Sequence, residues 1–362
     1  MMEIQILVIG AGPAGLMAAK YAAEAGANVL LAERADRLGG QLIKQTHKFF
    51  GSKEEYAGER GIDIAAKLID ECEKNSKISI WKNAQVLGIY PDGVVTVSYQ
   101  GNFCTVKPEK IIIATGAAEK TMAFANNDLP GIYGAGAVQT LMNVHGVLPA
   151  KRILMVGAGN IGVIVAYQLL QAGVDVAGVV EAGPAVGGYQ VHAAKLQRHG
   201  VPIYTSHSVK AAHGSCCLEG VTICRLDKNW QTVAGSEQYI EADGLCLAVG
   251  LSPLTELLWQ SGCEMKYVPE LGGYVPLRDG NLRTTRNDIY VAGDVSGVEE
   301  ASAAMVEGKI AGLEVAALLG CRKPDVYQAL QQARGQLRAL RSGPAGVKIC
   351  NGLRKVVLEE VG

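Results

Sequence analysis

Short apolar runs alternate with longer amphipathic or alanine-rich segments along most of this chain. Residues 4–9 and 152–156 are largely apolar and of strand length, and each precedes a glycine-rich turn and a segment typical of a helix. Two more apolar runs, residues 111–114 and 245–248, each end close to a glycine. Buried strands that alternate with helices predict an α/β fold with parallel sheets.

The two halves of the chain repeat the same order of elements. In the first half a predicted helix at 61–74 is followed by a strand-rich stretch at 78–106 and by the run that closes at Gly116. In the second half the helix is at 190–199 and the strand-rich stretch at 203–239. We therefore expect two Rossmann-like, three-layer units, each with a β-meander inserted before its last strand.

A last strand and helix complete the first unit. Residues 282–292 are expected to form a strand that ends at Gly293 and Asp294, and residues 299–319 a helix. An Asp at the carboxyl end of a parallel strand lies at the crevice where cofactors bind. The second unit is then inserted into the first. The expected domains are a first domain at 1–118 and 272–325, a second domain at 119–271, and a helical C-terminal extension at 326–362.

Both glycine-rich turns have the spacing of a dinucleotide-binding fingerprint. In this motif the first glycine makes a tight turn, the second lets a pyrophosphate approach the backbone, and the third permits close helix–strand packing. The phosphates bind at the helix N-terminus, and an acidic residue about 20 positions on accepts from a ribose hydroxyl. Glu33 and Glu181 stand at these positions. The two turns are Gly10-Ala-Gly12-Pro13-Ala14-Gly15 and Gly157-Ala-Gly159-Asn160-Ile161-Gly162.

Composition narrows the function classes. The formal net charge of −1 gives no sign of a nucleic-acid partner, and the apolar runs fall short of the ~18 residues that span a membrane. Nine cysteines show neither a C-x-x-C pair nor metal-ligand spacing. We expect no secretory leader, because Met1, Met2 and Glu3 run directly into the first strand. We therefore expect a cytoplasmic protein with reduced thiols and no metal site.

Together with Gly39-Gly40-Gln41-Leu42, the Ala114-Thr115-Gly116 turn and Ala292-Gly293-Asp294, the fingerprints resemble the pyridine nucleotide-disulfide oxidoreductase superfamily, which includes thioredoxin and glutathione reductases. The resemblance implies FAD at the first fingerprint and a nicotinamide nucleotide at the second. The implied FAD residues are Gly10, Gly12, Pro13, Ala14, Gly15, Glu33, Arg34, Gly40, Gln41, Leu42, Thr46, Ala114, Thr115, Gly116, Gly293 and Asp294. The implied nicotinamide-nucleotide residues are Gly157, Gly159, Asn160, Ile161, Gly162, Glu181, Ala248 and Gly250.

A narrower resemblance covers the hinge between the units. Residues 114–120, 124–131 and 134–140 are similar to the α-type subunits of heteromeric sarcosine oxidase, opine oxidase, proline dehydrogenase and hydrogen cyanide synthase. In such assemblies a separate flavoprotein subunit removes hydride from a C–N bond of a small amine or amino acid. The resemblance implies that this chain transfers electrons in such a complex, with a second flavoprotein subunit as a partner. Some of these relatives carry a C-terminal, cysteine-rich iron–sulfur module, whereas Cys350 is the only late cysteine here. A small iron–sulfur protein is therefore expected as a further partner.

The second site favours NAD(H) over NADP(H). Glu181 accepts from a free 2′-hydroxyl and repels a 2′-phosphate, and no Arg follows at 182–184. Another adenine nucleotide, held without hydride exchange, is an open alternative. No cysteine lies in residues 41–51, beside the expected flavin, so thioredoxin or glutathione reduction is not expected. We also identify no side-chain acid or base. None is required, because hydride transfer between nicotinamide and flavin needs juxtaposition of the two rings and exclusion of water.

Two other functions remain open on the sequence. The chain could be a stand-alone NADH:acceptor reductase that serves ferredoxin, a quinone or oxygen, or a scaffold subunit whose nucleotides are structural. The segment 325–341 places apolar residues on one face at helical spacing, namely Val326, Leu330, Ala333, Leu337 and Leu340. That face either packs on its own domain or docks a partner.

Overall fold

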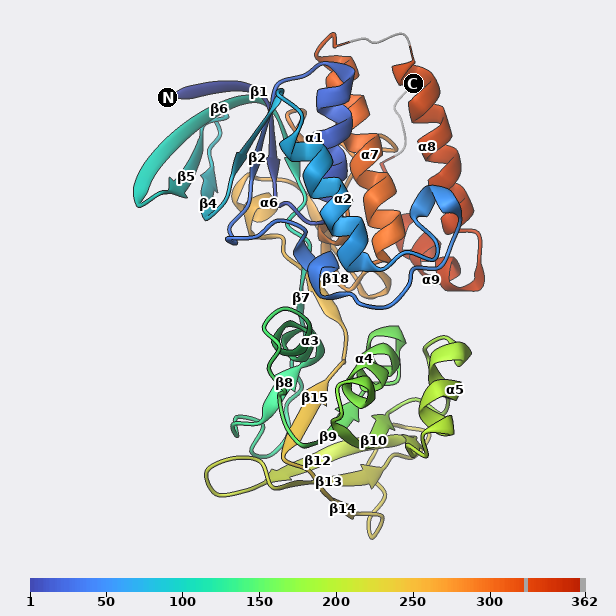
Figure 1. The fold of residues 1–362 in the computed structure, drawn as a ribbon. Coiled ribbons are helices and arrows are strands. Elements are labelled where there is room, and N and C mark those ends of the chain that lie inside the picture. The colour runs from blue at the N-terminus through green and yellow to red at the C-terminus, as the bar shows by residue number, and fades with distance from the viewer. Residues whose placement is uncertain (322–324, 359–362) are drawn as a thin grey trace. The chain divides into compact units, whose positions relative to one another are not determined.

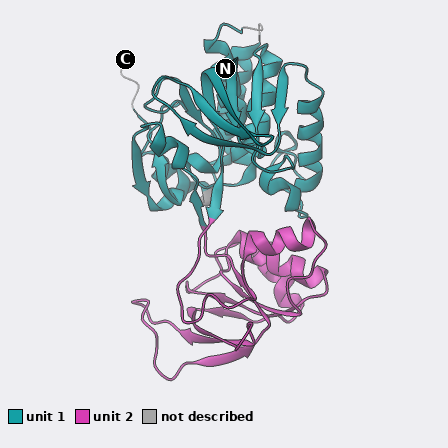
Figure 2. Ribbon diagram, turned by 90° about the vertical axis from the view of Figure 1, so that its left-hand side faces the viewer, with its two compact units in different colours: residues 1–118, 251–362 teal, residues 119–250 magenta. Residues whose placement is uncertain are grey.

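The computed structural model describes residues 1–321 and 325–358. Two short segments lie outside the described residues. They are residues 322–324, near the end of the expected first domain, and residues 359–362, at the end of the expected C-terminal extension. The chain forms two compact units: unit 1 comprises residues 1–118 and 251–362, and unit 2 is the continuous segment 119–250 (Figure 2). The expected insertion of one α/β unit into another is confirmed.

The sheet of unit 1 is parallel along β3-β2-β1-β6, and β19 adds a further parallel pairing with β6. β6 also pairs antiparallel with β5, which continues to β4 and forms the expected meander. The elements of unit 1 are β1 (Met2–Ile9), α1 (Pro13–Ala25), β2 (Val29–Ala32), α2 (Gly61–Glu73), β3 (Ile78–Trp81), β4 (Ala84–Ile89), β5 (Val95–Tyr99), β6 (Asn102–Ile113), α6 (Glu256–Gln260), β17 (Met265–Val268), β18 (Gly273–Pro276), β19 (Ile289–Val291), α7 (Ala301–Leu318), α8 (Val326–Leu340) and α9 (Pro344–Leu353).

The alternation of side chains along the buried strands supplies two cores in unit 1. Ile6 and Val8 of β1 face a core shared with α1, α2, α7 and α8, which lie side by side in Figure 1. Leu7 and Ile9 face the opposite core, which the meander and α6 complete. Burial on both faces explains why β1 is a nearly continuous apolar run.

Unit 2 repeats this plan on a smaller scale. Its five-stranded parallel sheet has the order β11-β10-β9-β15-β8, and a separate antiparallel meander contains β12, β13 and β14. One core lies between the sheet and the helices, and the other lies between the sheet and the meander. The elements of unit 2 are β8 (Ile132–Gly134), α3 (Ala135–Asn143), β9 (Arg152–Val156), α4 (Asn160–Gln171), β10 (Asp175–Glu181), α5 (Gln190–Arg198), β11 (Ile203–Thr205), β12 (His207–His213), β13 (Gly220–Arg225), β14 (Gln238–Glu241) and β15 (Gly244–Leu247).

The chain re-enters unit 1 at residue 251, whereas the sequence led us to expect residue 272. The outgoing strand β7 (Ala117–Glu119) and the returning strand β16 (Leu251–Pro253) pair with each other. Beyond β16, Leu258 and Cys263 are buried in the meander-side core of unit 1. This apolar burial places the segment after residue 250 with the first unit.

The expected strand at 282–292 is wrong in extent. Only Ile289–Val291 form β19, and the residues before it fold back as a tight hairpin. Leu282 has a φ of 67°, and Val291 N donates to its carbonyl oxygen. Within the turn, Arg286 and Asp288 form an ion pair of 2.8 Å. The apolar spacing that suggested one extended strand therefore arises from two short segments that pair antiparallel.

The apolar face of α8 packs within unit 1. Val326, Leu330, Ala333 and Leu337 are buried in the core that also contains α1 and α7. Of the two interpretations of this face, packing on its own domain is therefore correct.

Candidate dinucleotide sites

The first fingerprint forms the turn between β1 and α1, and the fold itself requires two of its glycines. Gly10 has a φ of 98°, and a Cβ there would lie 2.5 Å from the carbonyl oxygen of Ala114. A Cβ on Gly15 would lie 1.8 Å from the carbonyl oxygen of Gly10. Both substitutions would force the strand, the turn and the helix apart.

Gly12 is different, because nothing in the described part of the chain fills the space beside it. Its φ of −75° is open to any residue, and beyond its chain neighbours the atom nearest to a Cβ there is 4.0 Å away, on Gly40. The open space lies at the N-terminus of α1, where backbone N–H groups and the helix dipole attract anions. A glycine that the fold does not need, beside an open helix N-terminus, fits a site for a bound phosphate.

The fold brings the distant predicted FAD residues to this turn. The Cβ position of Gly40 lies 2.8 Å from Gly12, and that of Gly293 lies 2.9 Å from Ala14. Ala114 touches Gly10, as described above. Among the other predicted residues, Leu42 is buried, Thr46 and Gly116 are half-buried, and Arg34 and Gln41 are exposed. Thr115, also half-buried, donates from its hydroxyl to the carbonyl oxygen of Leu254 at 2.8 Å.

Glu33 is held against the back of the fingerprint. It follows β2, is 9% exposed, and accepts from the backbone N–H of Ala11 at 2.8 Å and of Ala35 at 2.9 Å. These bonds satisfy a buried carboxylate and fix its position at the carboxyl edge of the sheet. That position is the one the sequence pattern predicts for a ribose-binding acid.

Asp294 follows β19 at the same edge of the sheet. Burial raises the pKa of its carboxyl to about 7, and the negative charges of Glu307 and Glu299 add to this rise. The backbone N–H of Glu299, which donates to the Asp294 carboxylate at 3.3 Å, opposes it. Near neutral pH this carboxyl can therefore donate as well as accept a hydrogen bond.

Behind Asp294 lies a buried ionic network that the sequence analysis did not identify. Its centre is Glu307 on α7, which is 3% exposed and forms an ion pair with Arg278 at 2.9 Å and with Arg341 at 2.7 Å. Arg341 also pairs with Glu299 at 2.6 Å. One signal was present in the sequence, namely a lone acidic residue within the small and apolar run 301–308.

The second fingerprint has the same geometry in unit 2. A Cβ on Gly157 would lie 2.3 Å from the carbonyl oxygen of Ala248, and one on Gly162 would lie 1.9 Å from that of Gly157. At Gly159 no described atom beyond its chain neighbours and its own helix backbone lies within 4 Å of the Cβ position, and the φ of −71° is ordinary. The open position is again the second glycine, at the N-terminus of α4.

Glu181 at the end of β10 plays the same structural part as Glu33. It accepts from the N–H of Ala158 at 2.7 Å and of Gly183 at 2.8 Å. Beside it, Asn160 accepts from the N–H of Tyr189 at 2.8 Å, and Gly188 packs on the backbone at Gly159. Residues 187–189 thus form a wall of this turn that no motif in the sequence indicated. Of the other predicted residues, Ile161 is 42% exposed, Ala248 is half-buried and Gly250 is exposed.

Two segments of the narrower resemblance contact each other within unit 2. The carboxylate of Glu119 accepts from the N–H of Gly136 at 2.5 Å and of Ala137 at 3.3 Å, so it caps the N-terminus of α3. Nearby, Asn126 donates to the carbonyl oxygen of Ala212 at 2.9 Å and Asn127 to that of Met122 at 3.0 Å. Asn126 therefore ties its segment to β12, and Asn127 closes a local turn.

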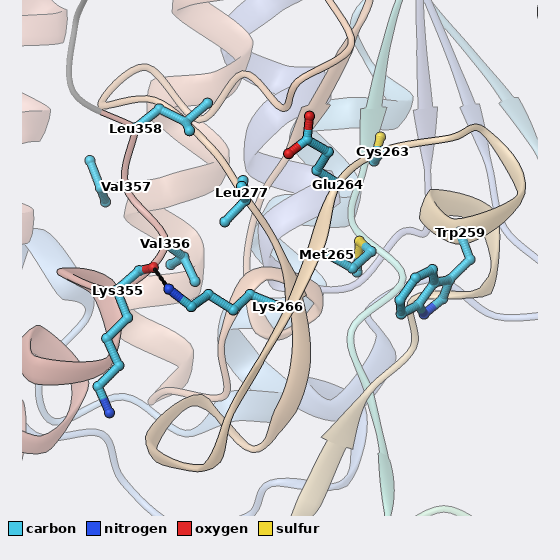
Figure 3. A pocket seen from close by; sticks show the side chains of 10 residues that line it. All are labelled: Trp259, Cys263, Glu264, Met265, Lys266, Leu277, Lys355, Val356, Val357 and Leu358. Atoms are coloured by element: carbon cyan, nitrogen blue, oxygen red, sulfur yellow. Dashed lines mark hydrogen bonds between the residues drawn. The ribbon is translucent and has the colours of Figure 1, made fainter.

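A surface pocket of about 410 Å³ lies elsewhere in unit 1, between β17 and residues 355–358 (Figure 3). Lys266 crosses it and donates from Nζ to the carbonyl oxygen of Lys355 at 2.9 Å. Its described lining contains none of the predicted nucleotide-binding residues. We therefore place the candidate sites at the fingerprints, where glycine sterics and helix N-termini coincide.

Comparison with protein families identifies the chain. The family model for pyridine nucleotide-disulphide oxidoreductases matches residues 4–308. The chain belongs to the pyridine nucleotide-disulphide oxidoreductase family. The match spans both fingerprints, the hinge and the Gly293–Asp294 turn, so the broad resemblance inferred from the motifs is confirmed. This family member is an oxidoreductase.

In the described part of the chain, no helix combines the length and apolarity that a membrane crossing requires.

Curated relatives also support the narrower resemblance. The family member is 30% identical to an opine oxidase subunit from Agrobacterium tumefaciens (strain Ach5) over 85% of its own length and 64% of that protein. It is 29% identical to the hydrogen cyanide synthase subunit HcnB of Pseudomonas protegens over 94% and 76% of the two chains. It thus spans less than two thirds of the opine oxidase protein.

A solved structure agrees on the fold. L-proline dehydrogenase from P. horikoshii superposes with a TM-score of 0.71 at 24% identity, over 91% of this chain and 59% of that one. This oxidoreductase therefore shares its two-domain fold with that L-proline dehydrogenase, and its curated relatives include proteins named as subunits of an opine oxidase and a hydrogen cyanide synthase.

Proposed function

We propose that this chain binds FAD at the first fingerprint and NAD(H) at the second, and that it is the electron-transferring subunit of a hetero-oligomeric amino-acid or amine dehydrogenase or oxidase. The observation that carries this proposal is the repeated geometry of the two turns. In each, the first and third glycines are required by packing, while the second faces open space at a helix N-terminus.

The residues of unit 1 fit FAD. The N–H groups that open α1 would bind the pyrophosphate, Glu33 would accept from the adenosine ribose, and Asp294 would contact the ribityl–pyrophosphate region. The segment from Gly40 to Thr46 would border the ring system. FAD, when bound, supplies an acceptor and donor of two electrons, taken as a hydride or singly.

The residues of unit 2 fit NAD(H) better than NADP(H). Glu181 is already fixed by two backbone N–H groups, so its carboxylate is preorganised to accept from a free 2′-hydroxyl. A 2′-phosphate at the same place would bring two negative charges together. If the site instead holds another adenine nucleotide structurally, the same contacts apply without hydride exchange.

A partner subunit would carry out the C–N oxidation. Relatives over most of this chain are named as subunits of an opine oxidase and a hydrogen cyanide synthase. We propose a second flavoprotein subunit as the site of amine or amino-acid oxidation, with a small iron–sulfur protein as a further carrier.

The decisive experiment combines cofactor analysis with rapid mixing. The purified chain should be yellow and release one FAD per polypeptide, and a colourless chain that rejects FAD on reconstitution would contradict the proposal. Rapid bleaching by micromolar NADH with turnover of ferredoxin, quinone or oxygen would favour the stand-alone reductase. A flavin reduced neither by NADH nor by substrate in the assembled complex would indicate a structural scaffold. Reduction by an amine or amino acid only when the partner subunit is present supports the proposal.

A further inference from the structure

The carboxylate of Glu307 divides its hydrogen bonds between two different sets of groups. Its Oε1 accepts from both terminal nitrogens of Arg278 at 2.9 Å and from Arg341 at 2.7 Å. Its Oε2 accepts from the backbone N–H of Gly293 at 2.9 Å and from the Ser296 hydroxyl at 3.3 Å. One oxygen thus faces cations, and the other holds the turn that carries Asp294.

This turn needs an external restraint. Gly293 has a φ of 77°, and its Cβ position abuts Ala14 in the first fingerprint, so a small movement of the turn would change the wall of the pyrophosphate space. The backbone N–H of a glycine in a short turn has few alternative partners when buried. A charged acceptor forms a stronger hydrogen bond to it than a neutral one.

The cations that hold Glu307 come from distant parts of the chain. Arg278 follows β18, and its backbone pairs with the C-terminal segment, accepting from Leu358 N at 2.8 Å and donating to Val356 O at 3.1 Å. Arg341 closes α8 and also binds Glu299, whose N–H donates to Asp294. Segments beyond residue 325 are therefore linked to the Asp294 turn indirectly. One link passes through Arg278 and Glu307, and the other passes from Arg341 through Glu299.

The ionic state of Glu307 is consistent with this arrangement. Burial by itself would raise the pKa of the carboxyl, but Arg278 and Arg341 lower it to about 2. A buried carboxylate that keeps its charge beside two guanidinium groups holds its neighbours in one geometry, because any displacement leaves an unpaired buried charge.

We propose that Glu307 is a positioning residue for FAD, which sets the Gly293–Asp294 turn, and that Arg341 makes the C-terminal helix α8 a structural part of the flavin site. This inference rests on the proposed function, namely that unit 1 binds FAD. Neither residue is predicted to touch the cofactor. They act through the backbone N–H of Gly293 and through Glu299.

The test compares two matched pairs of variants in the full chain. Glu307→Gln and Arg341→Gln each remove one charge of the proposed network. Glu314→Gln and Arg334→Gln remove another α7–α8 ion pair, of 3.1 Å, which does not contact the Gly293–Asp294 turn. For each flavin-free protein, FAD affinity is measured by fluorescence titration, the visible circular dichroism of bound flavin is recorded, and the unfolding temperature is measured.

We expect the network variants to weaken FAD binding by about tenfold or more and to alter the visible dichroism, while the control variants stay within about twofold. The inference fails if Glu307→Gln binds FAD as tightly as Glu314→Gln with an unchanged spectrum. It also fails if affinity follows unfolding temperature in all four variants. If Glu307→Gln does not fold, the comparison of Arg341→Gln with its control Arg334→Gln decides the question by the same criteria. A wild-type chain that does not bind FAD refutes the proposed function itself.

Discussion

Gly308 of α7 and Ala14 of α1 approach so closely that a Cβ on Gly308 would lie 2.1 Å from the carbonyl oxygen of Ala14. One turn further along, the Cβ position of Gly312 lies 2.3 Å from the carbonyl oxygen of Ala18. Two glycines spaced by four residues therefore let the two helix backbones touch. Beside this contact, Glu307, the neighbour of Gly308, accepts from the backbone N–H of Gly293 at 2.9 Å and so reaches the Gly293–Asp294 turn.

Gly308→Ala should destabilise unit 1 by about 1–3 kcal/mol or more, because the added methyl group forces α7 away from α1. Urea unfolding of the flavin-free chain measures this. The matched control is Gly335→Ala on α8, where no described atom outside the local helix backbone lies within 4 Å of the Cβ position. There the change should stabilise by up to about 1 kcal/mol through helix propensity. Equal effects at the two sites would contradict the steric interpretation.

Gly12→Val should yield a folded chain that lacks flavin, since its side chain enters the space that the fold leaves open. Gly15→Val should instead prevent stable folding, because its Cβ would overlap the carbonyl oxygen of Gly10. The measurements are the flavin-to-protein absorbance ratio and the thermal unfolding curve. A Gly12→Val protein that purifies yellow and fully loaded would show that the phosphate site lies elsewhere.

Glu181→Ala should weaken NADH binding by about tenfold and reduce the preference for NADH over NADPH, because a charge-assisted hydrogen bond to the ribose is lost. Equilibrium titration of both nucleotides provides the measurement. Asp175→Ala is a suitable control, since Asp175 begins the same strand and pairs with Arg152 at the surface. Unchanged discrimination in Glu181→Ala would remove the basis for NAD(H) specificity.

Gly159→Val should abolish nucleotide binding to unit 2 while leaving the flavin content and thermal stability of the chain unchanged. The side chain would occupy open space at the N-terminus of α4 rather than clash with the protein. Calorimetric titration with NADH and the flavin absorbance are the two readouts. Loss of flavin in this variant would mean that the two sites are not independent.

The raised pKa of Asp294 predicts that the stability of the flavin-free chain depends on pH. Its pKa is raised to about 7 in the folded state, against about 3.9 in an unfolded chain. Relative to Asp294→Asn, whose side chain does not titrate, the wild-type chain should therefore lose stability as pH rises from 4 to 7, by up to about 4 kcal/mol, since each unit of pKa difference corresponds to about 1.4 kcal/mol. Urea unfolding of both proteins between pH 4 and 8 tests the sign. A wild-type stability that rises with pH relative to that of Asp294→Asn would contradict it.

Local sequence patterns were sufficient for much of this fold. The order and spacing of the fingerprints, Glu33 and Glu181 specify the strand–turn–helix units, since their geometry depends on residues close in sequence. The apolar face of α8 was likewise readable from its period. The expected strand at 282–292 failed because alternation does not distinguish one extended strand from two opposed segments joined at Arg286 and Asp288.

By itself, the sequence determined that two Rossmann-like units exist and that the second lies inside the first. Only the tertiary structure decided that Arg278, Glu307 and Arg341 meet behind Asp294, and that the chain rejoins unit 1 at residue 251. The physical reason is sequence separation. A turn motif contains its own steric requirements, whereas a buried charge reveals its partners only when packing brings distant segments together and excludes water from them.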